Sequence, residues 1–212
     1  MPALRLAESA GLHDLLHERL RLDSPNPVAK STSVIGGMLA GPDSIDDLDL
    51  LRHGGMARLF GGVRAPSTLG TYLRSFTHGH VQQLDAIGAR VLAGLTERVP
   101  GLIAGAESAQ EMAFLDVDDT IREVHGYAKQ GAAYGYSRVR GLNAQLAVLS
   151  TPIAAPVISR ARLRRGNVAS ATGAGRLLAQ AISTARAAGV RGRMLARADS
   201  AYYGHARTRP SS

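Results

Sequence analysis

Residues 112–120 read MAFLDVDDT, an apolar run interrupted by three acids. The length and composition of this run are typical of a buried strand, which we predict from Met112 to Asp118. Alternate side chains of a strand share a face, so Asp116 and Asp118 point one way and Asp119 points the other. Two carboxylates on one face repel each other unless a cation or a proton neutralises them. The stretch therefore predicts a strand that carries a divalent-cation site.

A second apolar segment ends in an acid in the same way. Residues 194–202 read MLARADSAY, and we predict a strand from Arg193 to Asp199. Acids presented at strand ends commonly hold Mg²⁺ for phosphate chemistry, and such sites normally need three of them. No acid follows Asp199 in the printed sequence. The alternative is that Asp118, Asp119 and Asp199 only cap the segments that follow them.

The pattern of apolar residues changes near residue 105. Residues 1–105 predict an all-α module, with helices at Leu4–Leu22 and His78–Val99. Residues 106–205 predict further strands at Asn143–Ser150 and Ala155–Leu163 and a helix at Ser170–Ala188. Together with the two strands described above, the order is β-β-β-α-β. This order indicates a mixed sheet with a helix packed across it, and an α+β fold overall.

A short segment of the helical module is compatible with a helix-turn-helix. A first helix around Leu48, a glycine-rich turn at Gly61-Gly62 and a second helix opened by Pro66 have the expected order. Ordinary helical packing explains this pattern equally well. In the helix-turn-helix interpretation the second helix offers four side chains to DNA: Ser67, Thr68, Thr71 and Arg74.

Positive charge is concentrated in the last quarter of the chain. The net charge is +8, and residues 156–212 contain eleven arginines but a single acid. This imbalance favours a polyanionic partner such as DNA, for which Arg162, Arg164 and Arg165 are candidate contacts. A charged surface that only maintains solubility is the alternative. Only two of the 25 basic residues are lysines, and this arginine bias indicates a GC-rich bacterial genome.

Composition also bears on the cellular location of the protein and on the cofactors it could use. The sequence has no uncharged apolar run of about 18 residues, so we expect no membrane segment and a cytoplasmic, nucleoid-associated protein. The absence of cysteine excludes disulfides and thiolate zinc sites. No phosphate-binding loop of the Gly-Lys-Ser/Thr kind is present, so the sequence does not support ATP-dependent chemistry.

Several motifs occur in one order along the chain: LDVDDT at 115–120, VHGY at 124–127, GLN at 141–143 and RADSAYY at 197–203. In this order they resemble the DDE transposases of bacterial insertion sequences, of the group-1 kind found in actinobacteria. The resemblance extends from about residue 20 to His205. It implies a partial ribonuclease-H-like catalytic domain at 106–205, preceded by a DNA-binding helical module at 1–105.

The resemblance also implies roles for the acids. Asp118 corresponds to the first catalytic acid, with Asp116 as the close alternative, and Asp199 corresponds to the second. In the intact family these acids bind two Mg²⁺ ions for DNA cleavage and strand transfer, and DNA and a second copy of the chain are the partners implied. The third acid, a glutamate on a later helix, has no counterpart, and residues 206–212 do not resemble the family's continuation. We therefore expect a C-terminally truncated, catalytically incomplete transposase.

Two other functions fit parts of the same sequence. A DNA-binding or regulatory fragment that pairs with intact transposase requires no catalysis. Residues 114–120 also resemble the Asp-x-Asp-x-Thr motif of haloacid-dehalogenase-like phosphatases, in which Asp116 is the nucleophile and Asp118 the acid/base. That family has a doubly wound α/β fold and a later lysine, whereas no lysine follows Lys129.

Overall fold

The computed structural model describes residues 2–42, 44–53, 63–126 and 129–202. The chain forms two compact units that meet in sequence between Val99 and Pro100, close to the boundary expected at residue 105. The first unit is helical and the second combines a mixed sheet with a helix, so the mixed α+β class is confirmed. The glycine turn at 61–62 and the segment 206–212 lie outside the described residues.

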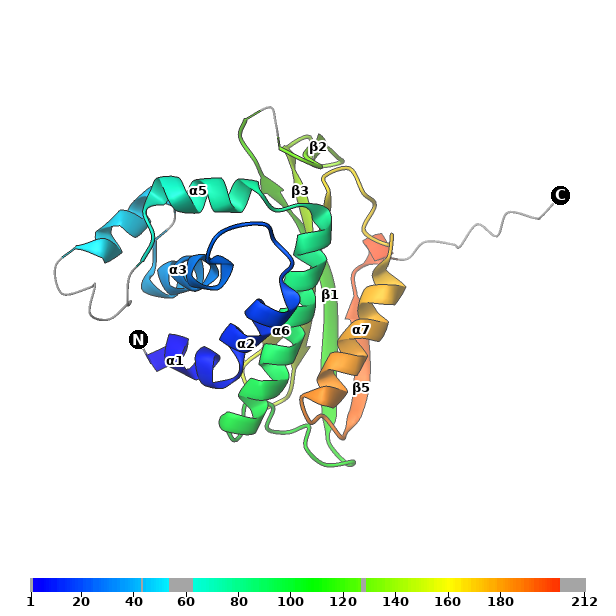
Figure 1. Ribbon diagram of the computed structural model, residues 1–212. Helices are drawn as coiled ribbons and strands as arrows, with labels where there is room; N and C mark the ends of the chain where they lie inside the picture. The colour runs from blue at the N-terminus through cyan, green and yellow to red at the C-terminus, as the bar shows by residue number, and fades with distance from the viewer. Residues whose placement is uncertain (1, 43, 54–62, 127–128, 203–212) are drawn as a thin grey trace. The chain divides into compact units, whose positions relative to one another are not determined.

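The first unit is built from helices of very different length (Figure 1). The longest is α6, which agrees with the helix predicted at His78–Val99. Its N-terminus is closed by a capping box between Thr77 and His80. The Thr77 side chain accepts the backbone N–H of His80, and His80 Nδ1 accepts the backbone N–H of Thr77. The elements of this unit are α1 (Pro2–Ser9), α2 (Leu12–Arg19), α3 (Pro27–Ala40), the 3₁₀ helix η1 (Asp46–Arg52), α5 (Pro66–Arg74) and α6 (His78–Arg98).

Two features of this unit differ from the sequence predictions. The single helix predicted at Leu4–Leu22 is two helices, because Gly11 adopts a left-handed conformation with φ 91° between them. Helix α3 was not predicted; it begins at Pro27, which is tolerated in the first turn of a helix because its missing N–H has no partner there. Its serines are poor helix formers in isolation, and tertiary contacts stabilise them: Ser31 Oγ lies 2.6 Å from the buried Tyr72 hydroxyl.

Apolar side chains of the helices form two clusters within the first unit. Helix α6 approaches the turn between α1 and α2 so closely that a Cβ on Gly94 would lie 2.5 Å from the Ala10 carbonyl oxygen. Only glycine allows that approach. The larger cluster is formed by Leu12, Leu16, Leu20, Leu22, Tyr72 and Ile87.

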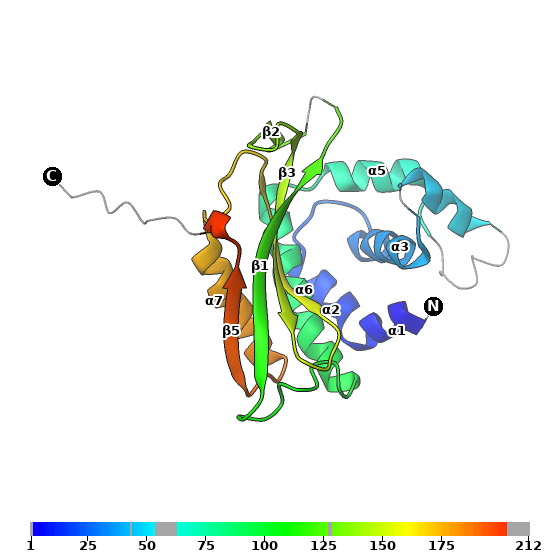
Figure 2. The same cartoon turned by 180° about the vertical axis from the view of Figure 1, so that it is seen from behind.

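The second unit is a mixed sheet covered on one face by a helix (Figure 2). Strand β3 pairs antiparallel with β1, with β4 and with the short β2, while β5 pairs parallel with β1. The main strand order is therefore β4-β3-β1-β5, and α7 connects β4 to β5. The elements are β1 (Met112–Glu123), β2 (Ala133–Tyr134), β3 (Arg140–Ser150), β4 (Val157–Arg165), α7 (Ala174–Ala187), β5 (Arg193–Ala198) and the 3₁₀ turn η2 (Ser200–Tyr202).

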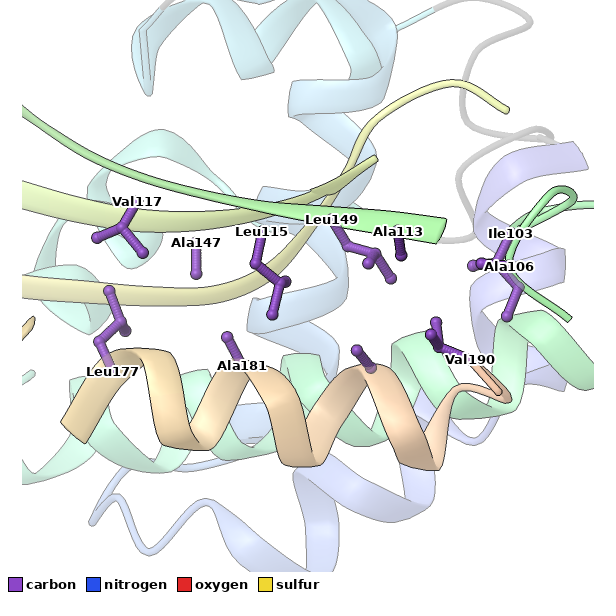
Figure 3. Close-up of a cluster of buried hydrophobic side chains, with 11 residues drawn as sticks. Ile103, Ala106, Ala113, Leu115, Val117, Ala147, Leu149, Leu177, Ala181 and Val190 are labelled. Atoms are coloured by element: carbon purple, nitrogen blue, oxygen red, sulfur yellow. The ribbon is translucent and has the colours of Figure 1, made fainter. Parts of the chain in front are cut away.

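Alternation along β1 decides which of its side chains face α7. Leu115 and Val117 are buried against the helix, and Figure 3 shows them above Leu177 and Ala181 of α7. The same alternation directs Asp116 and Asp118 to the opposite face, as predicted, and turns Asp119 toward the helix side. The remaining members of this core are Ile103, Ala106, Ala113, Ala147, Leu149, Ala185 and Val190.

The β-β-β-α-β order is present, but β1 is longer than its prediction. It continues through the polar residues to Glu123, since each is paired with β3 as far as Gly141. Composition does not predict a strand in this polar half, where the hydrogen-bonded partner stabilises the extended backbone. The two-residue β2 was missed for the same reason.

Candidate metal and nucleic-acid site

Two rows of charged residues lie across the junction of β1 and β5. In the first row Asp116 is opposite Arg197 in the parallel register. The guanidinium donates Nε–H to Asp116 Oδ1 at 2.6 Å and Nη2–H to Oδ2 at 2.7 Å. The same guanidinium lies 4.4 Å from the Phe114 ring centroid. The hydrogen bond to Asp116 raises the pKa of Arg197 further above its ordinary value, so the guanidinium remains charged and binds the carboxylate in a bidentate ion pair.

The second row consists of Asp118 and Asp199. The last registered pair of the two strands is Val117 with Ala198. Asp118 is the next residue of β1, which continues to Glu123, and Asp199 is the residue that follows the end of β5. Both are exposed. Where two carboxylates approach each other, a shared cation offsets their repulsion.

Each of these two carboxylates has one local hydrogen bond. Asp118 Oδ1 accepts the backbone N–H of Asp119 at 2.7 Å, and Asp199 Oδ1 accepts that of Ala201 at 2.9 Å. Asp199 therefore caps the η2 turn, as the capping alternative predicts. Within the described ranges, the second oxygen of each carboxylate has no hydrogen-bond or ion-pair partner. One oxygen of each acid is thus available to a ligand.

The three predicted metal ligands are not equivalent. Asp116 is neutralised by Arg197, while Asp118 and Asp199 have no basic partner among the described residues. In that part of the chain, no group of three acids or histidines is arranged to hold a metal ion. Asp116 is therefore occupied by an ion pair, and Asp118 and Asp199 are the two predicted ligands whose carboxylates remain available to a cation.

Asp119 lies on the helix side of the sheet, in a buried polar network. Arg164 Nη2 donates to Asp119 Oδ2 at 2.7 Å, and only 7% and 12% of the two side chains are exposed. Asn143 Nδ2 bonds the same oxygen at 2.5 Å, and Ser170 Oγ donates to Asp119 Oδ1 at 3.0 Å. Both carboxylate oxygens are satisfied inside the protein. Asp119 is therefore a structural acid.

The network also attaches the loop before α7 to the sheet. Arg164 Nη1 donates to the carbonyl of Thr172 at 2.6 Å, and Gln145 Nε2 donates to that of Ser170 at 2.9 Å. Tyr202, three residues after Asp199, packs against the main core, and burial raises the pKa of its phenol, with Asp119 and Asp118 contributing in the same direction. Gln145 Nε2 also lies 3.5 Å from the Tyr202 hydroxyl, so the network reaches the 3₁₀ turn that follows Asp199.

The predicted DNA contacts of β4 have different environments. Arg164 is 9% exposed, and its guanidinium is used by Asp119, Asn143 and loop carbonyls. Arg162 is partly buried and donates to the Gly173 carbonyl and to Gln180 of α7. Arg165 is exposed at the end of the strand. Of the three arginines, Arg165 has the most accessible side chain.

Helix α5 presents all four predicted contact residues to solvent. Leu69 and Tyr72 bury the opposite side of the helix. Thr71 Oγ1 donates to the carbonyl of Ser67, and Arg74 Nη2 donates to Thr71 Oγ1 at 3.2 Å. These weak surface contacts leave hydrogen-bonding capacity for a ligand. The exposed residues are Ser67, Thr68, Thr71 and Arg74.

Sequence reasoning missed the partners of two acids. It placed Asp119 on the opposite face from Asp118 but did not identify Arg164 as its buried partner. It also did not pair Arg197 with Asp116, although each lies two residues before the acid of the second row, Asp199 and Asp118 respectively. That equal spacing could have revealed the pair, because in-register parallel strands align equivalent positions.

The chain was compared with protein-family models, with curated proteins and with solved structures. The chain matches no family model, no curated protein and no solved structure. Among the helices described, none combines the length and the apolar composition needed to cross a bilayer.

Proposed function

We propose that this protein binds DNA and a divalent cation, and that its second unit is a DDE-transposase-like catalytic domain whose printed sequence carries two of the three acids. The observation that carries the proposal is the place of Asp118 and Asp199 in the sheet. Each is the residue after the last registered pair of the parallel strands β1 and β5, and each has one carboxylate oxygen without a partner among the described residues.

The sheet order supports a ribonuclease-H-like domain. That fold begins with three antiparallel strands, follows them with a helix, and adds a fourth strand parallel to the first. Strands β1, β3 and β4 with α7 and β5 have this order and these directions. The alternative phosphatase interpretation requires a doubly wound parallel sheet, whereas β1 is antiparallel to β3. The topology therefore favours the transposase-like interpretation.

The residues of the site would have different roles in binding the metal and in positioning its ligands. Asp118 and Asp199 each offer a carboxylate oxygen of the hard type that Mg²⁺ prefers. When bound, Mg²⁺ would activate a water or a DNA 3′-hydroxyl toward a phosphodiester and neutralise charge that develops there. The buried network around Asp119 would hold the strand ends, so that the two carboxylates need little reorganisation.

Titration of the protein with Mn²⁺, followed by electron paramagnetic resonance, tests the metal site. We expect binding that competes with Mg²⁺ and weakens at least about tenfold in Asp118→Asn and in Asp199→Asn, because each removes one of two anionic ligands. Glu123→Gln is the matched control, since it removes an exposed carboxylate from the far end of β1 and should leave the affinity unchanged. Equal affinity in all four proteins would disprove the site.

DNA binding is tested separately by gel shift with a labelled duplex at several salt concentrations. Affinity should fall steeply with salt, and Arg74→Ala should weaken binding and reduce the slope of log affinity against log salt by about one. Arg90→Ala is the control, because Arg90 is an exposed arginine of the same unit that bonds its own helix. No retardation at low salt would contradict DNA binding.

A second candidate function requires no catalysis. In it the chain binds transposon-end DNA through exposed side chains such as those of α5 and does not perform strand transfer. It would then act as a regulatory partner of an intact transposase, and the homodimer implied by the resemblance belongs to the same proposal. Mn²⁺-independent DNA binding without cleavage of supercoiled DNA would favour this function. Metal-dependent cleavage that Asp118→Ala abolishes would exclude it.

A further inference from the structure

Exposed tyrosines and arginines gather where the hairpin of β2 and β3 meets the end of β4. We propose that these side chains bind an unpaired strand of DNA, with the tyrosines stacked on bases and the arginines in contact with phosphates. The choice of DNA rests on the proposed function, whereas the surface includes none of the acids of the metal site. Its residues, here called the hairpin surface, are Arg122, Tyr134, Tyr136, Arg138 and Arg165.

The strand register puts three of these side chains on one face of the sheet. Arg122 of β1 and Arg165 of β4 are both opposite Leu142 of β3. Tyr134 of β2 is opposite Arg140, two residues earlier in β3, and Figure 1 shows β2 beside β3 at one end of the sheet. Opposite residues share a face, and so do residues two apart on one strand. Arg122, Tyr134 and Arg165 therefore all lie on the face away from α7.

Glycines hold the hairpin closely against the end of β4. A Cβ on Gly135 would collide with the carbonyl oxygen of Gly166, and a Cβ on Gly166 would collide with a carbonyl oxygen of β2. Only glycine permits such an approach. Gly135 lies between Tyr134 and Tyr136, and Gly166 directly follows Arg165. Backbone packing therefore fixes the two tyrosines close to Arg165.

The tip of the hairpin is a hydrogen-bonded turn that presents Tyr136 to solvent. The Arg138 N–H donates to the carbonyl of Gly135 at 3.0 Å, while the Tyr136 side chain is fully exposed. Arg138 has φ 58°, in the left-handed region that residues with a Cβ rarely adopt. Backbone conformations of this kind are concentrated at ligand-binding sites. The turn therefore holds an aromatic ring and a guanidinium outward at the same place.

The charge around the hairpin favours an anionic partner. In the described residues of 120–142 and 163–168, the exposed charged side chains are one acid, Glu123, and four bases: Arg122, Lys129, Arg138 and Arg165. A second copy of the chain, with its net charge of +8, would bring the same positive charge to the contact. An unpaired nucleic acid strand instead offers phosphates to the arginines and accessible base faces to the tyrosines. In a duplex those base faces are stacked on one another.

The first experiment measures affinity for a fluorescent oligodeoxythymidine of about 15 nucleotides, which forms no base pairs and is long enough for one site. Fluorescence anisotropy gives the affinity. Tyr136→Ala should weaken binding at least about fivefold, because one stacked base is lost, whereas Tyr136→Phe keeps the ring and should bind within about twofold of the native protein. Ile153→Ala is the matched control, since it removes a side chain that is 75% exposed in the turn between β3 and β4.

The salt dependence of the same binding tests the arginines. Arg138→Asn removes the charge but keeps a residue that tolerates the left-handed conformation. Arg138→Asn and Arg165→Gln should each reduce the slope of log affinity against log salt by about 0.7. Arg193→Gln is the matched control, because Arg193 is exposed on the same face of the sheet at its other end, opposite Met112.

Tyrosine emission distinguishes stacking from a structural role of Tyr136. The chain has six tyrosines and no tryptophan, so this emission can be measured directly. A base stacked on Tyr136 should quench part of the emission when an unlabelled oligodeoxythymidine binds. Tyr136→Phe should retain the affinity and lose that part of the quenching. Equal quenching in the two proteins would contradict stacking on this residue.

Binding of duplex DNA separates the hairpin surface from the proposed function. A loss of oligodeoxythymidine binding in Tyr136→Ala, with duplex binding unchanged, would support the surface even if the duplex contact of Arg74 failed its own test. Equal affinity of Tyr136→Ala and the native protein for oligodeoxythymidine would overturn the inference and leave duplex binding through Arg74 intact. An equal loss of single-strand and duplex binding would also overturn it, because a duplex does not offer its base faces.

Two further outcomes concern the identity of the strand. Tighter binding of oligouridine RNA than of oligodeoxythymidine of the same length would overturn the assignment to DNA. Absence of binding to either the single strand or the duplex at low salt would overturn both the hairpin surface and the proposed DNA binding.

Discussion

Arg164 and Asp119 form an ion pair at 2.7 Å inside the second unit, with both side chains almost completely buried. Arg164 comes from β4 and Asp119 from β1, and β3 lies between them. The pair therefore spans three strands and also attaches the loop before α7. The charged residues of the second unit thus form two sets, since Arg164 and Asp119 are internal whereas Asp116, Asp118 and Arg197 lie on the other face of the sheet.

The internal pair should contribute strongly to stability. Asp119→Ala leaves the Arg164 guanidinium buried and uncompensated, so we expect a loss of about 3–5 kcal/mol in the free energy of unfolding. Asp116→Ala is the control, because it removes an acid from an exposed pair in the same strand and should have little effect. Urea denaturation followed by circular dichroism compares the two variants. Equal losses would show that burial does not distinguish the pairs.

The core beneath the sheet offers a second test of the fold. Leu115 is fully buried between β1 and α7, and Leu115→Ala should cost about 3 kcal/mol. Leu195→Ala removes the same atoms from β5, where Leu195 is 49% exposed, and should cost less than about 1 kcal/mol. Amide hydrogen exchange in β1 measures the loss of stability in the second unit. A larger effect at Leu195 would contradict the assigned faces of the sheet.

Close packing in the helical unit depends on Gly94. Gly94→Ala places a Cβ 2.5 Å from the Ala10 carbonyl oxygen and should destabilise this unit by about 1–3 kcal/mol. Gly88→Ala, six residues earlier in α6, meets no atom within 4 Å and should stabilise the helix by about 0.5–1 kcal/mol. Thermal unfolding monitored by circular dichroism measures both changes. The opposite signs test how α6 packs on the turn at Ala10.

Stability at alkaline pH should depend on Tyr72. Burial raises the pKa of its phenol, although the hydrogen bond with Ser31 opposes this. A pKa raised in the folded state contributes stability that is complete below the ordinary tyrosine pKa of about 10 and is lost as pH rises through the folded value. Tyr72→Phe should therefore show a weaker pH dependence above pH about 10. It should also be about 1 kcal/mol less stable near neutrality, because the hydrogen bond between Tyr72 and Ser31 is lost.

The control for this pH dependence is Tyr134→Phe. Tyr134 is 68% exposed in β2, so its removal should leave the alkaline decline unchanged. Urea denaturation of the three proteins at a series of pH values gives the comparison. A decline of equal steepness in Tyr72→Phe and the native protein would assign the effect to another group.

Much of the second unit could be predicted from local patterns. Alternation in residues 112–120 correctly put Asp116 and Asp118 on one face, and the helical spacing of apolar residues located α6 and α7. These periodicities follow from the geometry of a single strand or helix, so a short segment contains them. The break at Gly11 and the whole of α3 were not predicted, because both depend on packing against other helices.

The sequence by itself determined that Asp116 and Asp118 share one face of a strand, the β-β-β-α-β order and the concentration of arginines toward the C-terminus. Only the tertiary structure decided what each charge does. It buries Arg164 against Asp119, pairs Arg197 with Asp116, and leaves Asp118 and Asp199 without a basic partner among the described residues. The physical reason is that partners of a charge are chosen by strand register and burial, which join residues some 45 to 81 positions apart in the chain.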